Sequence, residues 1–294
     1  MYKDKDNTHL VIEGANEKNI IKGFGEFDLK NTFECGQCFR WETQADGSYR
    51  GVAGGVDAVV SKIGDEIHIK GPSLEQVKSF WIDYLDLSRD YKKLCNKLSA
   101  LDNKMSQAID FSRGLRLLRQ PFFEVLISFI ISQNNNVPRI SGIIDRICRE
   151  CGEKLSDERF AFPEPEQLIK LKEADYSRLG AGYRSIYLEK IVKLYDEGHI
   201  DSEHLATIDF HQARNALIDL PGIGPKVADC VLLYSGLHQE AFPSDVWVKR
   251  VMMELYELKN ANEIFNFTQG YFGKDAGYAQ QFLFHYARTL KMGV

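Results

Sequence analysis

Two patterns of hydrophobic and polar positions follow one another along the chain. Between residues 9 and 72, short β-prone runs alternate with turn signals typical of hairpins, namely Asp46-Gly47, Gly54-Gly55 and Gly64-Asp65. The predicted strands cover residues 38–41, 49–52, 57–63 and 66–70. This part of the chain therefore indicates an antiparallel sheet.

From about Ser73 the apolar positions recur with the period of a helix. Ser73 and Gln76 resemble a capping box that opens a helix over residues 73–85. Pro121 opens a helix through residue 131 that is almost wholly apolar, so we expect it to be central and buried. Further helices are predicted over residues 138–151, 165–174, 185–197, 209–219, 225–235, 246–257 and 276–290.

These patterns predict an α+β fold with two domains. Residues 1–118 are predicted to form an antiparallel β-sheet domain with flanking helices, and residues 119–294 an all-α domain. A chain of 294 residues, 44% of them hydrophobic, is long enough to bury two cores.

Composition and charge limit the classes of function. No apolar run reaches the roughly 20 residues of a membrane span, and the charged start over residues 1–6 does not resemble a signal peptide. We expect a soluble, intracellular protein. The net charge of −5 argues mildly against a nucleic-acid partner, so DNA would have to bind a local patch or backbone amides.

The six cysteines include two C-x2-C pairs, Cys35 with Cys38 and Cys148 with Cys151, which together could supply four zinc ligands. The second pair, however, lies inside a helical pattern, where two thiols three residues apart share one face. We therefore predict no metal site.

The segment 220–230, LPGIGPKVADC, is the most informative part of the chain. Its first Pro-Gly pair ends one helix, Gly224 permits a positive φ, and Pro225 fits the first turn of the next helix. Ile223 is expected to anchor this hairpin in the core. Free amides at the start of the second helix suit a phosphate, so Gly222 and Gly224 are predicted to contact DNA. An ordinary helix corner is the alternative.

Lys226 is the second residue of that helix, where the positive end of the helix dipole disfavours a cation. Its apolar neighbours Val227 and Ala228 act in the same direction. Both features favour an uncharged amine, which is the nucleophilic form. A direct contact with phosphate is the alternative role.

Asp245 is expected to cap the helix over residues 246–257 and to lie near Lys226. An ionised carboxylate there would stabilise the positive charge that develops on a sugar as its base leaves. Cys230 projects from the same helix face as Lys226 and can line a pocket for a flat base. A plain helix cap and a buried core cysteine are the respective alternatives.

This lysine–aspartate pattern resembles the helix-hairpin-helix DNA glycosylases, and more narrowly the 8-oxoguanine DNA glycosylases of the eukaryotic type, in a bacterial version. Ordered motifs through most of the chain carry the resemblance: 35–41 (CGQCFRW), 115–119 (LRLLR), 132–136 (SQNNN), 138–142 (PRISG), 179–184 (LGAGYR), 243–245 (PSD) and 278–284 (YAQQFLF).

The resemblance implies a bifunctional glycosylase and abasic-site lyase that excises 8-oxoguanine from double-stranded DNA in base excision repair. It also implies that the N-terminal β-sheet domain is TBP-like and that the protein is a monomer in the cytoplasm, associated with the nucleoid or, in a eukaryote, nuclear. Lys226 would form the Schiff base and Asp245 would be its acidic partner. No cofactor is required, although hairpin carbonyls near Leu220 and Ile223 could hold a structural cation.

The family also implies how the base is recognised. Gln280 would bind the edge of the flipped base, and Phe284 and Cys230 would enclose its two faces. The carbonyl of Gly36 would accept the N7 hydrogen that 8-oxoguanine has and guanine lacks. Guanine would instead present an acceptor to an acceptor, at a cost of about 1–3 kcal/mol.

The family also implies a set of residues that fill the gap left in the duplex by the flipped base and that contact the opposite base. Tyr183 and Asn134 match the family's wedge and gap filler. Arg139 and Arg184 match arginines that contact the widowed cytosine, whose acceptor edge suits a guanidinium. Ordinary surface arginines and a core aromatic are the alternatives.

The sequence departs from the family at three positions. Trp247 stands where the animal enzymes have a histidine near the DNA backbone, Pro225 replaces a threonine, and Cys38 replaces a serine. No cysteine follows Cys230, so the four-cysteine iron–sulfur loop of a related branch is absent from this sequence.

Two other functions compete with this interpretation. An alkylpurine glycosylase shares the architecture but typically lacks the lysine, so Lys226, Gly36 and Gln280 speak against it. A non-catalytic DNA-binding hairpin would keep Gly222 and Gly224 but would not need Lys226 beside Asp245.

Overall fold

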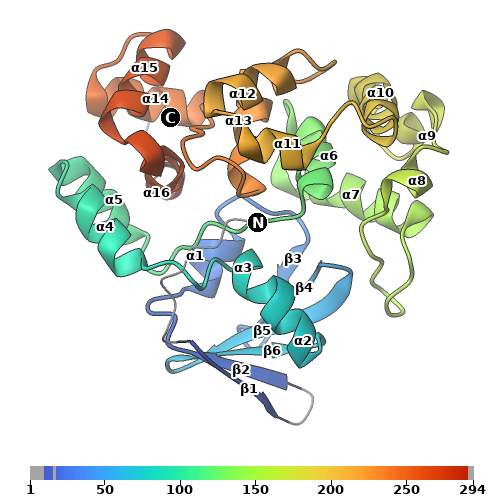
Figure 1. Ribbon diagram of the computed structural model, residues 1–294, viewed down its shortest axis with the longest axis horizontal. Coiled ribbons are helices and arrows are strands. Elements are labelled where there is room, and N and C mark those ends of the chain that lie inside the picture. The colour runs from blue at the N-terminus through green and yellow to red at the C-terminus, as the bar shows by residue number, and fades with distance from the viewer. Residues whose placement is uncertain (1–9, 16–17, 291–294) are drawn as a thin grey trace.

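The computed structural model describes residues 10–15 and 18–290, and it confirms the predicted α+β class (Figure 1). The charged start over residues 1–6, on which the signal-peptide prediction depends, lies outside the described residues. Within the described ranges, no helix combines the length and apolarity needed to cross a membrane. Nor does any group of three or more His, Cys, Asp or Glu among those residues suit a metal ion.

The N-terminal part forms a six-stranded antiparallel sheet in the order β1-β2-β6-β5-β4-β3. The strands are β1 (Val11–Ala15), β2 (Lys18–Lys22), β3 (Trp41–Thr43), β4 (Tyr49–Ala53), β5 (Val56–Ile63) and β6 (Glu66–Lys70). The predicted hairpin turns are confirmed, since Gly47, Gly54 and Gly64 all have positive φ. The predicted strand over 38–41 is wrong except at its end, because side chains tie residues 35–38 into a loop.

Helices cover one face of this sheet and form the rest of the described chain (Figure 1). The first group is α1 (Leu29–Phe33), α2 (Leu74–Gln76), the π-helical turn η1 (Val77–Trp81), α3 (Ile82–Tyr84), α4 (Tyr91–Ser99) and α5 (Asn103–Phe111). The capping box at Ser73 is confirmed.

The second group is α6 (Phe122–Ser132), α7 (Val137–Cys151), α8 (Pro165–Leu168), α9 (Glu173–Arg178), η2 (Gly182–Arg184), α10 (Ser185–Asp196), α11 (Ser202–Thr207), α12 (Phe210–Ile218), α13 (Pro225–Tyr234), α14 (Val246–Tyr256), α15 (Ala261–Tyr271), η3 (Gly273–Asp275) and α16 (Ala276–Thr289). As predicted, α6 is central and buried. The predicted helix over 165–174 is instead two short helices, the second of which starts after a cap at Lys172.

Two hydrophobic cores hold these elements. One lies between the sheet and α1–α3 and contains Trp81, which is fully buried. The other lies in the helical part and also receives Leu98 and Met105 from α4 and α5. These two helices, which precede residue 118, therefore pack with the helical part. The domain boundary at residue 118 stays a prediction.

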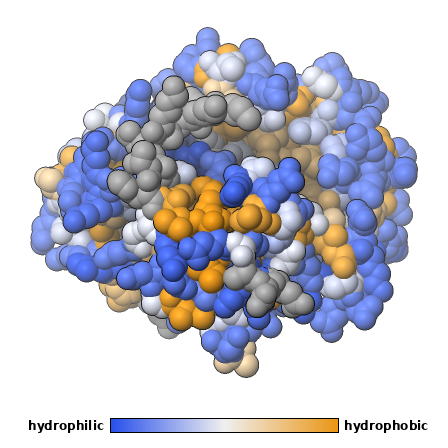
Figure 2. Space-filling model, turned by 60° about the horizontal axis from the view of Figure 1, so that its bottom comes forward, coloured by the Kyte–Doolittle hydropathy of each residue, from blue (hydrophilic) through white to orange (hydrophobic). Residues whose placement is uncertain are grey.

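Apolar residues are not confined to the cores. Figure 2 shows a face on which hydrophobic residues gather near the middle, with hydrophilic residues around them. The exposed large hydrophobic residues of the sheet domain include Val11, Ile63 and Leu74.

Arg116 crosses between the two parts of the molecule. Its guanidinium is fully buried and donates hydrogen bonds to the carbonyl oxygens of Phe24, Glu26 and Asp86. It also lies 4.3 Å from the ring centroid of Tyr91. Carbonyl dipoles and an aromatic face thus stabilise a cation that burial alone would disfavour.

Asp86 supplies the acidic centre of the same junction. Its Oδ2 accepts from the Tyr91 hydroxyl at 2.9 Å and from the Tyr278 hydroxyl at 3.3 Å. Its carboxylate also pairs with Arg89 at 3.0 Å and Arg119 at 3.1 Å. Because Tyr278 belongs to α16, this carboxylate fixes α16 against the sheet domain.

We expect Asp86→Ala to lower the free energy of unfolding by about 3–5 kcal/mol, since it leaves buried charges and hydroxyls without their acceptor. Asp110→Ala is the control, because its pair with Arg113 is exposed and should be worth about 1 kcal/mol or less. Urea unfolding followed by circular dichroism measures both. Equal losses in the two variants would show that Asp86 contributes no more stability than an exposed ion pair.

Candidate active site

The predicted hairpin joins α12 to α13, and Pro225 opens the second helix as expected. Ile223 is 4% exposed, which confirms that it anchors the hairpin in the core. The positive φ predicted for Gly224 is wrong, because its φ is −92°. The turn instead places Gly222 at φ +78°, where an added Cβ would lie 2.4 Å from Cγ of Tyr187.

Gln133, directly after α6, connects the hairpin to the η2 turn. Its side-chain amide donates to the carbonyl oxygen of Gly222 at 3.0 Å. Its own carbonyl oxygen accepts from the hydroxyl of Tyr183 at 3.2 Å and from Nε of Arg184 at 2.8 Å. One residue therefore holds the predicted phosphate hairpin and the predicted wedge in a fixed relation.

Lys226 lies in the first turn of α13 and is half-buried. Its Nζ lies 5.1 Å from the ring centroid of Phe129 and donates to Oγ of Ser132 at 3.4 Å. Both partners belong to α6, the most apolar helix of the protein. The amine thus lies at the edge of the core and close to water.

Cys230, one turn further along α13, is buried. Burial raises the pKa of its thiol to about 11, the nearby Lys226 amine opposes this rise, and the Asp245 carboxylate adds to it. The thiol is therefore uncharged at neutral pH, and it experiences the fields of both predicted catalytic groups. No ion pair joins Lys226 directly to Asp245 among the described residues.

Asp245 caps α14 as predicted, since its Oδ1 accepts from the backbone N–H of Val248 at 2.8 Å. The segment before it is tied to α16, because Nε2 of Gln280 donates to the carbonyl oxygen of Pro243 at 3.1 Å. The predicted acid and the predicted base-recognition helix are thus held together. Trp247, two residues on, lies under the Arg250 guanidinium at 5.9 Å.

Gln280 is 2% exposed, yet its Oε1 has no hydrogen-bond partner within the part of the chain that the structure describes. A buried acceptor without a donor costs about 1–3 kcal/mol. A ligand that brings an N–H to this oxygen would recover that energy.

Gly36 has a φ of +88°, and an added Cβ would lie 3.6 Å from Cε1 of Phe284. The structure therefore brings the Gly36 backbone, whose carbonyl is the predicted acceptor, next to the predicted stacking ring. Gln37 fixes this loop by donating to the carbonyl oxygens of Thr32 and Arg116, each at 2.8 Å. From α16, Gln281 adds a bond to the Cys35 carbonyl oxygen at 3.4 Å.

The predicted wedge residues lie on one exposed edge. Tyr183 is 55% exposed, so the alternative of a core aromatic is wrong for it. Asn134 is exposed with a φ of +46°, a strained backbone of the kind that gathers at functional sites. Arg139 is exposed at the start of α7.

Arg184 differs from the other predicted opposite-base contacts, since it is 2% exposed and is not an ordinary surface arginine. Its guanidinium donates to the carbonyl oxygens of Ala181, Gln133 and Asn134. It therefore holds the loop that carries Asn134, and its contact with the widowed base stays a prediction.

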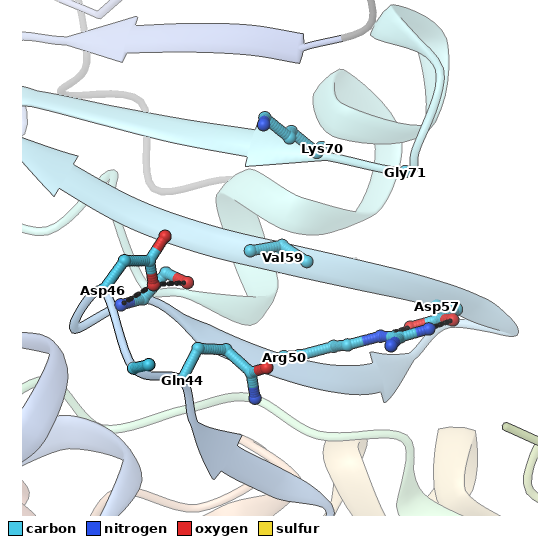
Figure 3. A pocket seen from close by; sticks show the side chains of 9 residues that line it. Gln44, Asp46, Arg50, Asp57, Val59, Lys70 and Gly71 are labelled. Carbon is cyan, nitrogen blue, oxygen red and sulfur yellow. Dashed lines mark hydrogen bonds and ion pairs between the residues drawn. The ribbon is translucent and has the colours of Figure 1, made fainter. Parts of the chain in front are cut away.

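Sequence reasoning gave no role to Ser132, Phe129, Gln133 or Arg288. Ser132 and Gln133 were visible only as members of a motif, and their contacts become apparent only when α6 packs against α13. A separate open hollow on the sheet, lined by residues such as Arg50, Asp57 and Lys70, contains none of the predicted site residues (Figure 3).

Known protein families match almost the whole chain. Residues 19–126 match the N-terminal domain of 8-oxoguanine DNA glycosylase, and residues 127–267 match the HhH-GPD superfamily of base excision DNA repair proteins. The fold and the hairpin site are thus those of a helix-hairpin-helix repair protein.

Individual relatives are consistent with these matches. The probable N-glycosylase/DNA lyase of Methanothermobacter thermautotrophicus is 32% identical over 90% of this chain and 94% of its own length. An N-glycosylase/DNA lyase of Arabidopsis thaliana is 29% identical over 88% of this chain and 77% of its length.

A solved structure of the Clostridium acetobutylicum 8-oxoguanine glycosylase/lyase, with double-stranded DNA containing cytosine opposite 8-oxoguanine, is also similar. It is 38% identical with a TM-score of 0.92, and the match covers 97% of this chain and 99% of that one. The chain therefore belongs to the family of 8-oxoguanine DNA glycosylase/lyases, which confirms the resemblance found in the sequence.

The two hairpin glycines form a matched pair of test positions. Gly222→Ala should lower stability by about 1–3 kcal/mol, because the new methyl group meets Tyr187, and it should weaken DNA binding as the turn shifts. Gly224→Ala meets no atom within 4 Å and should leave stability unchanged or raise it by up to about 1 kcal/mol. Urea unfolding and fluorescence anisotropy with a duplex measure the two effects, and the reverse ranking would contradict this assignment of the turn.

Proposed function

We propose that the chain excises 8-oxoguanine from double-stranded DNA and then cleaves the abasic strand, as a base excision repair enzyme. The observation that carries this proposal is the position of Lys226. Its half-buried amine lies beside the buried Cys230 thiol. The Asp245 carboxylate is also close enough to raise the pKa of that thiol through its charge. The family membership supports the same reaction.

Recognition of the base would use groups from both parts of the protein. The unpaired Oε1 of Gln280 suits an N–H on the edge of a purine, and the Gly36 carbonyl suits the N7 hydrogen of 8-oxoguanine. Phe284 would stack on one face of the base, a contact worth about 1–3 kcal/mol, and Cys230 would contact the other. The small, uncharged thiol fits a flat ring.

The chemistry would proceed by displacement at the sugar. The uncharged Lys226 amine attacks C1′, the bond from C1′ to N9 breaks, and its electron pair leaves with the base, which then gains a proton. The Asp245 carboxylate stabilises the positive charge that develops on the sugar. The ring opens to a Schiff base on Nζ, loss of a proton from C2′ expels the 3′ phosphate, and the strand is nicked.

Access to the base would require the damaged nucleotide to flip out of the duplex, which costs a few kcal/mol of lost stacking. Tyr183 and Asn134 would fill the gap, and Arg139 and Arg184 would contact the opposite cytosine. Arg184 needs a rearrangement of its bonds to the 133–134 carbonyls before it can do so.

The hairpin would hold the DNA backbone through amides near Gly222 and Gly224, so binding does not depend on the net charge. Carbonyls near Leu220 and Ile223 are oxygen donors of the kind that hard cations prefer, and a structural cation there would rigidify the turn. The Leu220 carbonyl also accepts from the Ile223 N–H at 3.2 Å, which leaves it a second lone pair. The chemical steps need no cofactor, and we expect the enzyme to act as a monomer.

Borohydride trapping tests the proposed lysine. An 8-oxoguanine duplex incubated with the native protein and borohydride should give a covalent adduct on a denaturing gel, and Lys226→Gln should give none. Asp245→Asn keeps the amine and should lower the rate of base release by about 10²–10³ while preserving the fold.

Parallel duplexes separate this function from its rivals. Release of alkylated purines without release of 8-oxoguanine would indicate an alkylpurine glycosylase. Binding without release of either base would indicate a non-catalytic hairpin module. An undiminished adduct in Lys226→Gln would remove that lysine from its role.

A further inference from the structure

Arg288 lies at the rim of the proposed base pocket. It follows Phe284 by one turn of α16, and its guanidinium carbon is 5.9 Å from the centroid of that ring. Its Nη1 is 3.0 Å from the position that a Cβ on Gly36 would occupy. The guanidinium therefore lies beside two groups to which the resemblance gives a part in binding the damaged base, the Gly36 backbone and the Phe284 ring.

The Arg288 side chain is exposed, and no carboxylate within residues 10–15 and 18–290 forms an ion pair with it. Its field reaches the surrounding groups: burial lowers the pKa of His285 and Arg288 lowers it further, while Arg288 opposes the rise that burial causes in the pKa of Cys35. An anion arriving at this rim would therefore meet a cation that no described carboxylate pairs with.

We propose that Arg288 is a DNA-binding positioning residue that covers Gly36 and Phe284 in the free protein and pairs with a lesion-strand phosphate when the base enters. This inference rests on the proposed function, because it assumes that Gly36 and Phe284 receive the base. It adds a residue to which the sequence analysis gave no role.

The exchange follows from the strengths of the two contacts. The Arg288 guanidinium, itself exposed and 5.9 Å from the centroid of the half-buried Phe284 ring, is held weakly, whereas a guanidinium and a phosphate form charge-assisted, often bidentate hydrogen bonds. Phe284 loses the cation but gains a stacked purine, and Arg288 loses the ring but gains an anion. The DNA backbone thus uncovers the pocket as it delivers the nucleotide.

Salt dependence of DNA binding gives the first test, at about pH 8, where His285 is uncharged because its pKa is lowered from 6.5. Arg288→Ala should reduce the slope of log affinity against log salt concentration by about 0.9, the value for one lost phosphate contact. Arg288→Lys keeps the charge and should keep the slope. Arg149→Ala removes an exposed arginine already paired with Asp145 at 2.7 Å, so its slope should equal that of the native protein.

Binding of free 8-oxoguanine to the DNA-free protein gives the second test, by equilibrium dialysis. Because Arg288→Ala removes the side chain that covers Gly36 and Phe284, it should bind the free base at least about threefold more tightly than the native protein. Arg149→Ala should bind the free base as the native protein does. An unchanged salt slope, or free-base binding no tighter in Arg288→Ala, would each overturn the proposal. Excision of 8-oxoguanine by the same native sample separates the two hypotheses, because its absence would contradict the proposed function itself.

Discussion

The packing of α13 against α6 is the contact on which the rest of the site depends. Phe129 of α6 stacks on Tyr234 of α13 with ring centroids 5.1 Å apart, and its ring also lies beside the Lys226 amine. The helix that carries the lysine is therefore fixed by apolar burial. The loop that follows α6 then adds polar contacts through Ser132 and Gln133. The lysine, the hairpin and the wedge edge all take their positions from this one helix pair.

The other half of the site depends on how α16 is held. Tyr278 and Gln281 attach this helix to Asp86 and to the Cys35 carbonyl of the sheet domain. Between them lies Gln280, whose unpaired oxygen is the clearest sign of a ligand. The sheet domain is thus part of the site, because it supplies the Gly36 loop and fixes α16, the helix that faces this loop.

Features that depend on a few neighbouring residues could be predicted from the sequence. The caps at Ser73 and Asp245 and the anchoring of Ile223 are confirmed because each follows from local geometry. The positive φ was assigned to the wrong glycine, since two glycines in one turn are equally able to adopt it and only the close approach of Tyr187 decides between them. The burial of Arg184 and the position of Arg288 depend on carbonyls and rings far along the chain, so no local pattern could reveal them.

The central claim is that the Lys226 amine forms a covalent bond to the sugar of the damaged nucleotide. Its most direct test is mass-spectrometric mapping of the borohydride-reduced adduct after digestion with protease and nuclease. The account predicts one modified peptide, with the sugar remnant on Nζ of Lys226. A remnant on any other residue, with Lys226 unmodified, would contradict it.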